Sequence, residues 1–380
     1  MAYFLSSDAV LRWLEVPSVY HIRKDDLYEL DEDSFRFIRK CSSAKGCNSD
    51  DREFIDYCLS EGILTENRIV SVRQPVIRSA NPSLRYLEMQ ITDRCNLRCR
   101  HCYIGDGTSS ELSVEHMRSI LRQFEAMQGL RVMITGGEPL MHGYFEEINE
   151  MLPDFFLRKV LFSNGLLLKT DLLKRLHVDE IQVSIDGLEE AHEALRGRGT
   201  FKKAVRAVRQ AIDCGFGVSV ATMVHQKNLS DFGKMEELFI RLGIKDWTVD
   251  IPCLEGRLKE NVEFIVPPEI GGKYLRYGHG EGLHTGAPGY ACGLHLMSVM
   301  ADGRVAKCSF YADSPVGSIK EGLRKCWHKI RPVRLCELTC DCDMIESCRG
   351  GCRYRALQLG NPVGKDLYKC FYYDKILDKY

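Results

Sequence analysis

The stretch LRYLEMQITDRCNLRCRHC, residues 84–102, decides the fold of this chain. Residues 84–91 read as a short strand, and Cys95, Cys99 and Cys102 follow it with the spacing Cx3Cx2C. Three closely spaced thiolates suit a soft metal site, either zinc or an iron–sulfur cluster. Zinc motifs usually pair two ligands with two more at a distance, whereas this loop supplies three together. The segment therefore predicts a metal centre on a loop that directly follows a strand, and the ligand spacing favours an iron–sulfur cluster.

The region around this segment alternates strand and helix signals. Short apolar or β-branched runs lie at 84–91, 131–135, 159–163, 180–185, 217–224 and 245–251. Helical patterns lie between them at 113–127, 144–155, 201–215 and 231–243. This alternation predicts an α/β fold with a parallel sheet and right-handed crossovers, either doubly wound or a barrel. Ligands gather at the carboxyl ends of the strands in both folds, so the cysteine loop lies at the functional edge.

Composition limits the class of protein. The chain has 380 residues, with 52 Lys and Arg against 53 Asp and Glu, which argues against a strongly basic nucleic-acid binder. The sequence contains no run of about 18 apolar residues, so it predicts no membrane span. The 17 cysteines, an odd number in a sequence without a signal-peptide pattern, point to metal ligands rather than disulfides. We therefore expect a cytoplasmic metalloprotein with no membrane or nucleic-acid partner.

Composition also shifts along the chain, which predicts four parts. Residues 1–82 read as a small α+β domain, with a hairpin and a helix in 19–41 and a second helix in 50–66. Residues 83–255 carry the strand–helix repeats, and residues 256–290, rich in Gly and Pro, read as a connector. Residues 291–380 are rich in cysteine and weakly periodic, as expected of a domain that is held together by metal.

Further motifs stand at the ends of successive predicted strands. They are Gly136-Gly137-Glu138-Pro139, Ser163-Asn164-Gly165 and Ser184-Ile185-Asp186-Gly187. Behind a Cx3Cx2C loop, this order resembles the radical S-adenosylmethionine (SAM) enzymes, although His101 stands where that family usually has an aromatic residue. The resemblance implies a partial (β/α)6 barrel. It also implies a [4Fe–4S] cluster on the three cysteines, with one iron left open for SAM.

The resemblance assigns roles to individual residues. Gly136 and Gly137 would let the backbone approach the methionine amine of SAM, and Glu138 would anchor that amine. Ser163 and Asn164 end the third strand, Ser184 and Asp186 would face the nucleoside, and Arg196 would lie near the methionine carboxylate, with Asn228 a weaker match. A capping aspartate or a solvated arginine would give the same pattern. The implied chemistry is reductive cleavage of SAM to a 5′-deoxyadenosyl radical, with the electron supplied by a flavodoxin or ferredoxin type of donor.

The C-terminal cysteines are similar to the SPASM extension of radical SAM enzymes. The matching residues are Cys292, Cys308, Cys340, Cys342, Cys348, Cys352 and Cys370. The resemblance implies two auxiliary [4Fe–4S] clusters, three in all: a nearer one on Cys292, Cys308 and Cys352, and an outer one on Cys342, Cys348 and Cys370. Either Cys340 or Cys336 would complete the outer cluster. A pair of structural zinc sites is the alternative.

One expected ligand of the nearer cluster is missing from the sequence. Gly286 stands where that extension often has a cysteine. His284 or Cys253 could fill the gap, or one iron could stay open to bind substrate.

The layout of residues 1–82 resembles winged-helix-like domains that capture a leader peptide as an added strand, and a plain structural appendage is the alternative. Taken together, the resemblance implies an enzyme, a radical SAM oxidoreductase or maturase. It would modify a peptide or protein by a crosslink, a thioether or related C–H functionalisation. A small-molecule substrate such as a porphyrin or haem precursor is the alternative. An electron carrier would not need the GGEP and SIDG segments. No side chain beyond the cluster ligands is assignable as catalytic.

Overall fold

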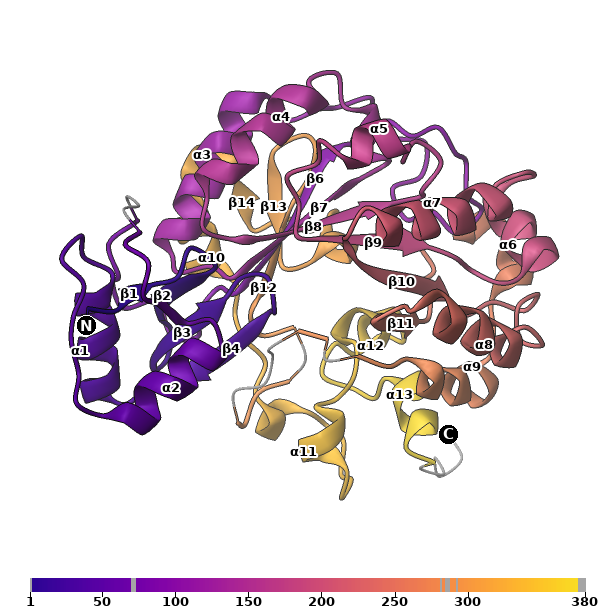
Figure 1. Cartoon of the computed structure of the whole chain (residues 1–380). Helices are drawn as coiled ribbons and strands as arrows, with labels where there is room; N and C mark the ends of the chain where they lie inside the picture. Colours follow the sequence, from indigo (N-terminus) through magenta and orange to yellow (C-terminus); the bar gives the residue numbers. More distant parts are fainter. Residues whose placement is uncertain (1, 70–72, 281, 284–287, 292, 375–380) are drawn as a thin grey trace.

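A nine-stranded sheet forms the centre of the molecule in the computed structural model, which describes residues 2–69, 73–280, 282–283, 288–291 and 293–374 (Figure 1). The strand order is β11-β10-β9-β8-β7-β6-β12-β13-β14. Six consecutive parallel strands make the barrel part: β6 (Tyr86–Thr92), β7 (Arg131–Gly136), β8 (Arg158–Ser163), β9 (Glu180–Ser184), β10 (Gly217–Met223) and β11 (Asp246–Asp250). All six predicted strands are confirmed, and so is the α/β fold class.

Helices cover the outer face of this curved sheet (Figure 1). The four predicted helices are confirmed as α3 (Val114–Ala126), α4 (Phe145–Met151), α7 (Phe201–Asp213) and α8 (Phe232–Leu242). Two short helices, α5 (Thr170–Leu173) and α6 (Glu189–Arg196), were not predicted. Alternate residues of β6, Leu87, Met89 and Ile91, are fully buried in the core between sheet and helices. The period of two therefore leaves the intervening side chains on the inner face of the barrel.

The C-terminal region continues the same sheet. Strand β12 (Leu296–Val299) pairs in parallel with β6, and β13 (Arg304–Ala306) and β14 (Gly317–Ser318) follow in antiparallel pairing. Four helices complete this region: α10 (Leu323–Lys329), α11 (Ile345–Cys348), α12 (Arg353–Gln358) and α13 (Leu367–Tyr372). The predicted connector contains a helix, α9 (Pro268–Tyr274), which packs against α13. No helix of the described residues is long and apolar enough to span a membrane.

The N-terminal residues form a small α+β unit. A three-stranded sheet, β2 (Ala9–Trp13), β3 (Pro17–His21) and β4 (Asp26–Glu29), precedes α1 (Glu32–Cys41) and α2 (Arg52–Ser60), and β1 (Phe4–Leu5) pairs with β5 (Leu64–Thr65). Asp31 caps α1 by accepting from Ser34 N at 2.7 Å, and Asp51 caps α2 by accepting from Phe54 N at 3.0 Å. The predicted hairpin and both predicted helices are confirmed.

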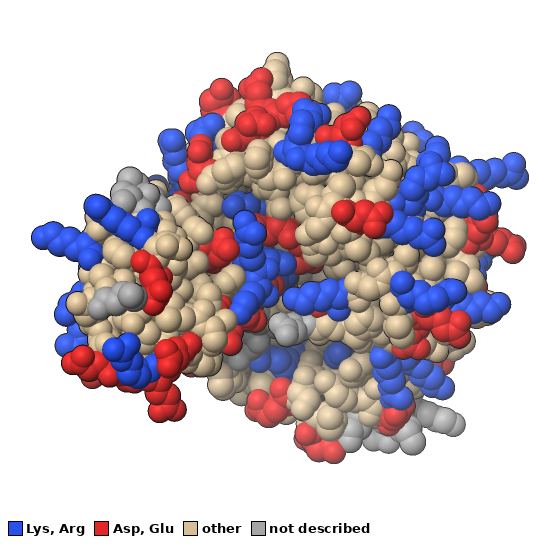
Figure 2. Space-filling view, viewed as in Figure 1, with Lys and Arg blue, Asp and Glu red and all other residues tan. Residues whose placement is uncertain are grey.

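This N-terminal unit packs on the barrel at the end where the strands begin. The buried side chain of Arg12 donates to Gly129 O at 3.0 Å, just before β7. Arg158, the first residue of β8, donates to Ile22 O at 2.8 Å, and Arg131, the first residue of β7, pairs with Asp25. Charged side chains gather where the unit meets the barrel (Figure 2). The unit is thus anchored at the end of the barrel opposite the cysteine loop.

Candidate active site

Cys95, Cys99 and Cys102 lie on the loop after β6, at the carboxyl edge of the sheet. Cys99 is buried, Cys102 is half-buried and Cys95 is exposed. Burial raises the pKa of the Cys99 thiol to about 11, and Cys102 and Cys95 act on the same thiol electrostatically. A four-iron cluster binds each thiolate at a different iron, so three thiolates on one loop fit such a cluster.

Gly136 and Gly137 bring the end of β7 against the backbone of this loop. A Cβ atom on Gly136 would lie 2.2 Å from Thr92 O, and one on Gly137 would lie 2.3 Å from Arg94 O. Gly137 N donates to Thr92 O at 2.8 Å, and Glu138 N donates to Arg94 O at 2.8 Å. The glycines therefore permit a backbone contact that any side chain would block. Their approach to a methionine amine stays a prediction.

Glu138 joins β7, β8 and the cysteine loop through one buried carboxylate. Its Oε1 accepts from Ser163 Oγ at 3.0 Å, and its Oε2 accepts from Asn164 N at 2.9 Å. Asn164 Nδ2 in turn donates to Asn96 Oδ1 at 2.7 Å, inside the cysteine loop. Burial raises the pKa of Glu138 to about 7. A carboxylate has further acceptor capacity, so these contacts are compatible with a role in binding an amine.

Asp186 and Arg196 form a buried ion pair beside the loop. Arg196 Nε donates to Asp186 Oδ2, and Arg196 Nη1 lies 4.0 Å from Cys99 Sγ. Met223 N donates to Asp186 Oδ1 at 2.7 Å. Burial opposes the ionisation of Asp186, but the Arg196 guanidinium outweighs it and holds the pKa of that carboxyl well below its usual range. Ser184, half-buried at the end of β9, lies two residues from Asp186.

The buried His192 and His225 and the half-buried His101 lie around this ion pair, and of the three only His101 was singled out in the sequence. His192 Nδ1 accepts from Asp186 N at 3.1 Å, and His225 Nε2 lies 2.8 Å from Asp186 O. Asn228 Nδ2 donates to the same Asp186 O at 3.0 Å, so Asn228 joins the segment after β10 to the segment after β9. Among the described residues, His101 Nδ1 and His192 Nε2 have no hydrogen-bond partner. Unpaired buried nitrogens of this kind can bind a polar ligand.

A cavity of about 390 Å³ opens between the cysteine loop and the C-terminal region. Its lining includes Gln90 on the inner face of the barrel, Tyr103 next to Cys102, and Ser309 and Phe310 next to Cys308. The Tyr103 and Phe310 rings are in contact, with their centroids 5.4 Å apart. A substrate held in this cavity would lie between the two cysteine regions.

The C-terminal cysteines fall into two groups. Cys352 interacts electrostatically with Cys253 and with Cys308. Cys370 interacts electrostatically with Cys348 and Cys340, and Cys340 does so with Cys342. Cys336 is exposed. Of the other predicted ligands, Cys292 and His284 lie outside the described residues.

Comparison with known proteins identifies the class. Residues 89–239 match the family model of the Radical SAM superfamily, from within β6 to within α8, and the match includes every strand-end motif described above. Residues 89–239 therefore form a radical SAM domain, and this family implies a [4Fe–4S] cluster and SAM as cofactors.

The similar curated proteins include a maturation protein, a maturase and a heme synthase. The sporulation killing factor maturation protein SkfB of Bacillus subtilis is 27% identical over 67% of this chain and 66% of that protein. The mycofactocin maturase MftC of Mycolicibacterium smegmatis is 26% identical over 73% of this chain and 80% of that protein. The AdoMet-dependent heme synthase of Nitratidesulfovibrio vulgaris is 28% identical over 48% and 52%. The chain thus spans from about half to four fifths of the length of these relatives.

Two solved structures share the fold. Streptococcus suis SuiB bound to precursor peptide SuiA has a TM-score of 0.66 at 14% identity, over 96% of this chain and 98% of that chain. The enzyme anSMEcpe with bound AdoMet and Cp18Cys peptide has a TM-score of 0.61 at 20% identity, over 77% and 96%. At these identities the likeness establishes architecture, which here extends from the N-terminal unit to the C-terminal region.

Proposed function

We propose that this enzyme modifies a peptide or protein by radical chemistry, forming a crosslink, a thioether or a related C–H functionalisation. The observation that carries the proposal is the cavity between the two cysteine regions, in a chain whose N-terminal unit contains a three-stranded sheet. SuiB, whose fold covers the whole arrangement, was solved with its precursor peptide; SkfB is named a maturation protein and MftC a maturase.

The carboxyl edge of the barrel supplies the cofactor site. Cys95, Cys99 and Cys102 would hold the [4Fe–4S] cluster, and SAM bound there supplies a 5′-deoxyadenosyl radical when an external flavodoxin or ferredoxin type of donor provides an electron. Glu138 would bind the methionine ammonium, because a nearby cation favours the ionised form of a buried carboxyl. Arg196, oriented by Asp186, would bind the methionine carboxylate.

The other predicted contacts belong to the same proposal. The hydrogen-bonded strand ends at Ser163 and Asn164 would fix the position of Glu138, while Gly136 and Gly137 would bring the backbone close to the methionine amine. Ser184 and Asp186 would face the nucleoside. The surrounding barrel wall would exclude water from the reacting atoms.

The C-terminal cysteines would hold two auxiliary [4Fe–4S] clusters. Cys308 and Cys352, with Cys292, would serve the nearer one, and Cys342, Cys348 and Cys370 the outer one. Cys340 interacts electrostatically with both Cys348 and Cys370, which favours it over the exposed Cys336 as the remaining outer ligand. In this proposal residues 1–82, 83–255, 256–290 and 291–380 act as recognition domain, barrel, connector and auxiliary-cluster domain.

The edge strand β4 would bind the leader segment of the substrate. Among the described residues β4 pairs with β3 alone, so its outer edge can accept an added strand. Leu30 N donates to Pro17 O, and the alternation of an antiparallel ladder then points the N–H of Glu29 to the free edge. Glu29→Pro should therefore block strand addition while it leaves the β3–β4 pairing intact.

A binding and activity assay tests this proposal. Candidate precursor peptides encoded beside the gene are incubated with reconstituted enzyme, SAM and reductant, and their masses are measured. Loss of two hydrogens in one peptide supports a crosslink, and Glu29→Pro should weaken binding of that peptide whereas Glu29→Ala should not. A porphyrin substrate is the second candidate, favoured by the heme synthase relatives. Porphyrin turnover that is indifferent to Glu29→Pro would establish it instead.

A further inference from the structure

Cys253 lies where the end of the barrel meets the C-terminal region. It follows β11 by three residues, its side chain is buried, and its thiol interacts electrostatically with that of Cys352. Cys352 is the N-cap residue of α12 and interacts electrostatically with Cys308. Thiols from three separate segments of the chain thus interact through Cys352.

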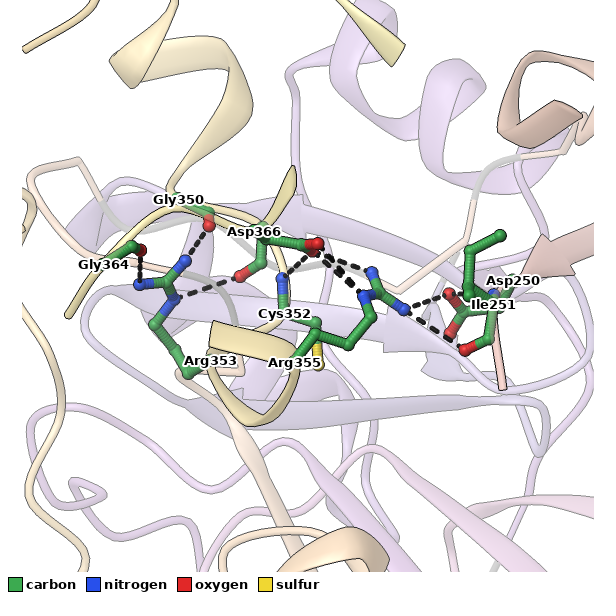
Figure 3. A network of polar contacts seen from close by, with 9 residues as sticks. Asp250, Ile251, Gly350, Cys352, Arg353, Arg355, Gly364 and Asp366 are labelled. Carbon is green, nitrogen blue, oxygen red and sulfur yellow. Dashed lines mark hydrogen bonds and ion pairs between the residues drawn. The ribbon is translucent and has the colours of Figure 1, made fainter. Parts of the chain in front are cut away.

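An ion-pair network, buried except at the half-exposed Asp250, holds the end of β11 against the segment of Cys352 (Figure 3). Arg355 on α12 donates to Asp250 Oδ1 at 2.7 Å and to Asp366 Oδ2 at 2.9 Å. Asp366, which is fully buried, also accepts from Cys352 N at 2.7 Å. The guanidinium of Arg355 therefore connects the last residue of β11 to the backbone of Cys352.

A second set of contacts fixes the residues directly after Cys253. Tyr354 on α12 donates from its hydroxyl to Glu255 Oε1 at 2.7 Å. Gln358, one turn further on, donates to Leu254 O at 3.1 Å and accepts from Leu254 N at 3.3 Å. Cys253 is therefore bracketed by bonds to α12 on both sides, at Asp250 and at Leu254.

We propose that Cys253 is a ligand of the nearer auxiliary cluster, together with Cys308 and Cys352. The inference rests on the proposed function, in which the C-terminal cysteines bind clusters. On ligation the Cys253 thiol loses its proton to solvent as its sulfur–iron bond forms, and no iron changes oxidation state. Cys253 then supplies the thiolate that the sequence lacks at Gly286, so a residue from the end of the barrel completes the ligand set proposed above for this cluster. The cluster then has no iron open to substrate.

The test uses full-length protein in which Cys95, Cys99 and Cys102 are changed to Ala, so that only auxiliary clusters form. After anaerobic reconstitution and mild ferricyanide oxidation, a cluster with three cysteine ligands loses its open iron and gives a [3Fe–4S] signal in electron paramagnetic resonance. Cys253→Ala should increase this signal by about one spin per chain over the parent. Cys58→Ala, which removes an equally buried thiol from the N-terminal unit, should not change it.

Iron content and circular dichroism separate the outcomes. A loss of about four irons per chain in Cys253→Ala, with an unchanged circular dichroism spectrum, also supports the proposal. Cys253→Ser keeps the shape of the side chain and serves as the second variant if Cys253→Ala does not fold. A changed cluster signal in Cys253→Ser then supports the proposal. Parent-like iron content and signal in these variants overturn it. If the parent itself binds no auxiliary iron, the auxiliary-cluster proposal fails as well.

Discussion

The buried pair of Asp186 and Arg196 gives the sharpest prediction of stability. Arg196→Met removes the guanidinium but keeps most of the apolar side chain, so Asp186 is left as a fully buried carboxylate without its counter-charge. Removing one partner of a buried pair costs about 3–5 kcal/mol. Asp186 keeps its bond from Met223 N at 2.7 Å, which places the expected loss at the low end, about 3 kcal/mol. For a unit of this size that corresponds to a fall of roughly 6–12 °C in Tm.

The measurement is thermal unfolding of the metal-free protein followed by circular dichroism, with Arg198→Met as control. Arg198 is two residues away and exposed, so its loss should leave Tm nearly unchanged. The pH dependence follows from the lowered pKa of Asp186: this carboxyl stabilises the native protein above its unfolded-state pKa, and that stability is lost as pH falls. The loss of Tm caused by Arg196→Met should therefore be smaller at acidic pH. Equal Tm values for Arg196→Met and Arg198→Met would refute the reasoning.

Three further predictions concern the cofactor site and the N-terminal unit. Gly137→Ala should reduce the iron bound by the first cluster several-fold, because the new Cβ would lie 2.3 Å from Arg94 O. The iron is measured in a variant without the C-terminal cysteines. Gly233→Ala, where a Cβ would point into open space, should leave the iron content unchanged. SAM affinity, measured by equilibrium dialysis, should fall about tenfold per pH unit below the Glu138 pKa of about 7, and Glu138→Gln should bind weakly at every pH. Glu29→Pro should weaken binding of the precursor peptide at least tenfold against Glu29→Ala, measured by fluorescence anisotropy, and equal affinities would exclude β4 as the docking edge.

The barrel could be predicted because its signals are local. Each of its six strands is a short apolar or β-branched run, and the first four, β6 to β9, end at chemically distinctive motifs that meet at one edge of the sheet. Helix α9 could not be predicted, since its Gly271-Gly272 pair indicates a loop by propensity. In the structure Gly272 lies against α13, where a Cβ would meet Tyr368 O at 2.4 Å, so tertiary contact overrides propensity.

The cysteines of the first cluster could likewise be predicted from a local signal, whereas Cys253 could not. Cys95, Cys99 and Cys102 are recognisable because their spacing is itself the signal. Cys253 is 99 residues from Cys352 in the sequence and carries no motif, so only the folded chain brings the two thiols near enough to interact. The continuation of the sheet into β12 was missed for a related reason, because a four-residue strand is too short to show a period.

Reductive cleavage of SAM tests the central claim most directly. Anaerobically reconstituted protein is incubated with SAM and dithionite, and 5′-deoxyadenosine is measured by liquid chromatography. We expect 5′-deoxyadenosine from the native chain and from Cys58→Ala, and none above background from the Cys95/Cys99/Cys102→Ala variant. Equal 5′-deoxyadenosine from the triple variant and the native chain would contradict the account.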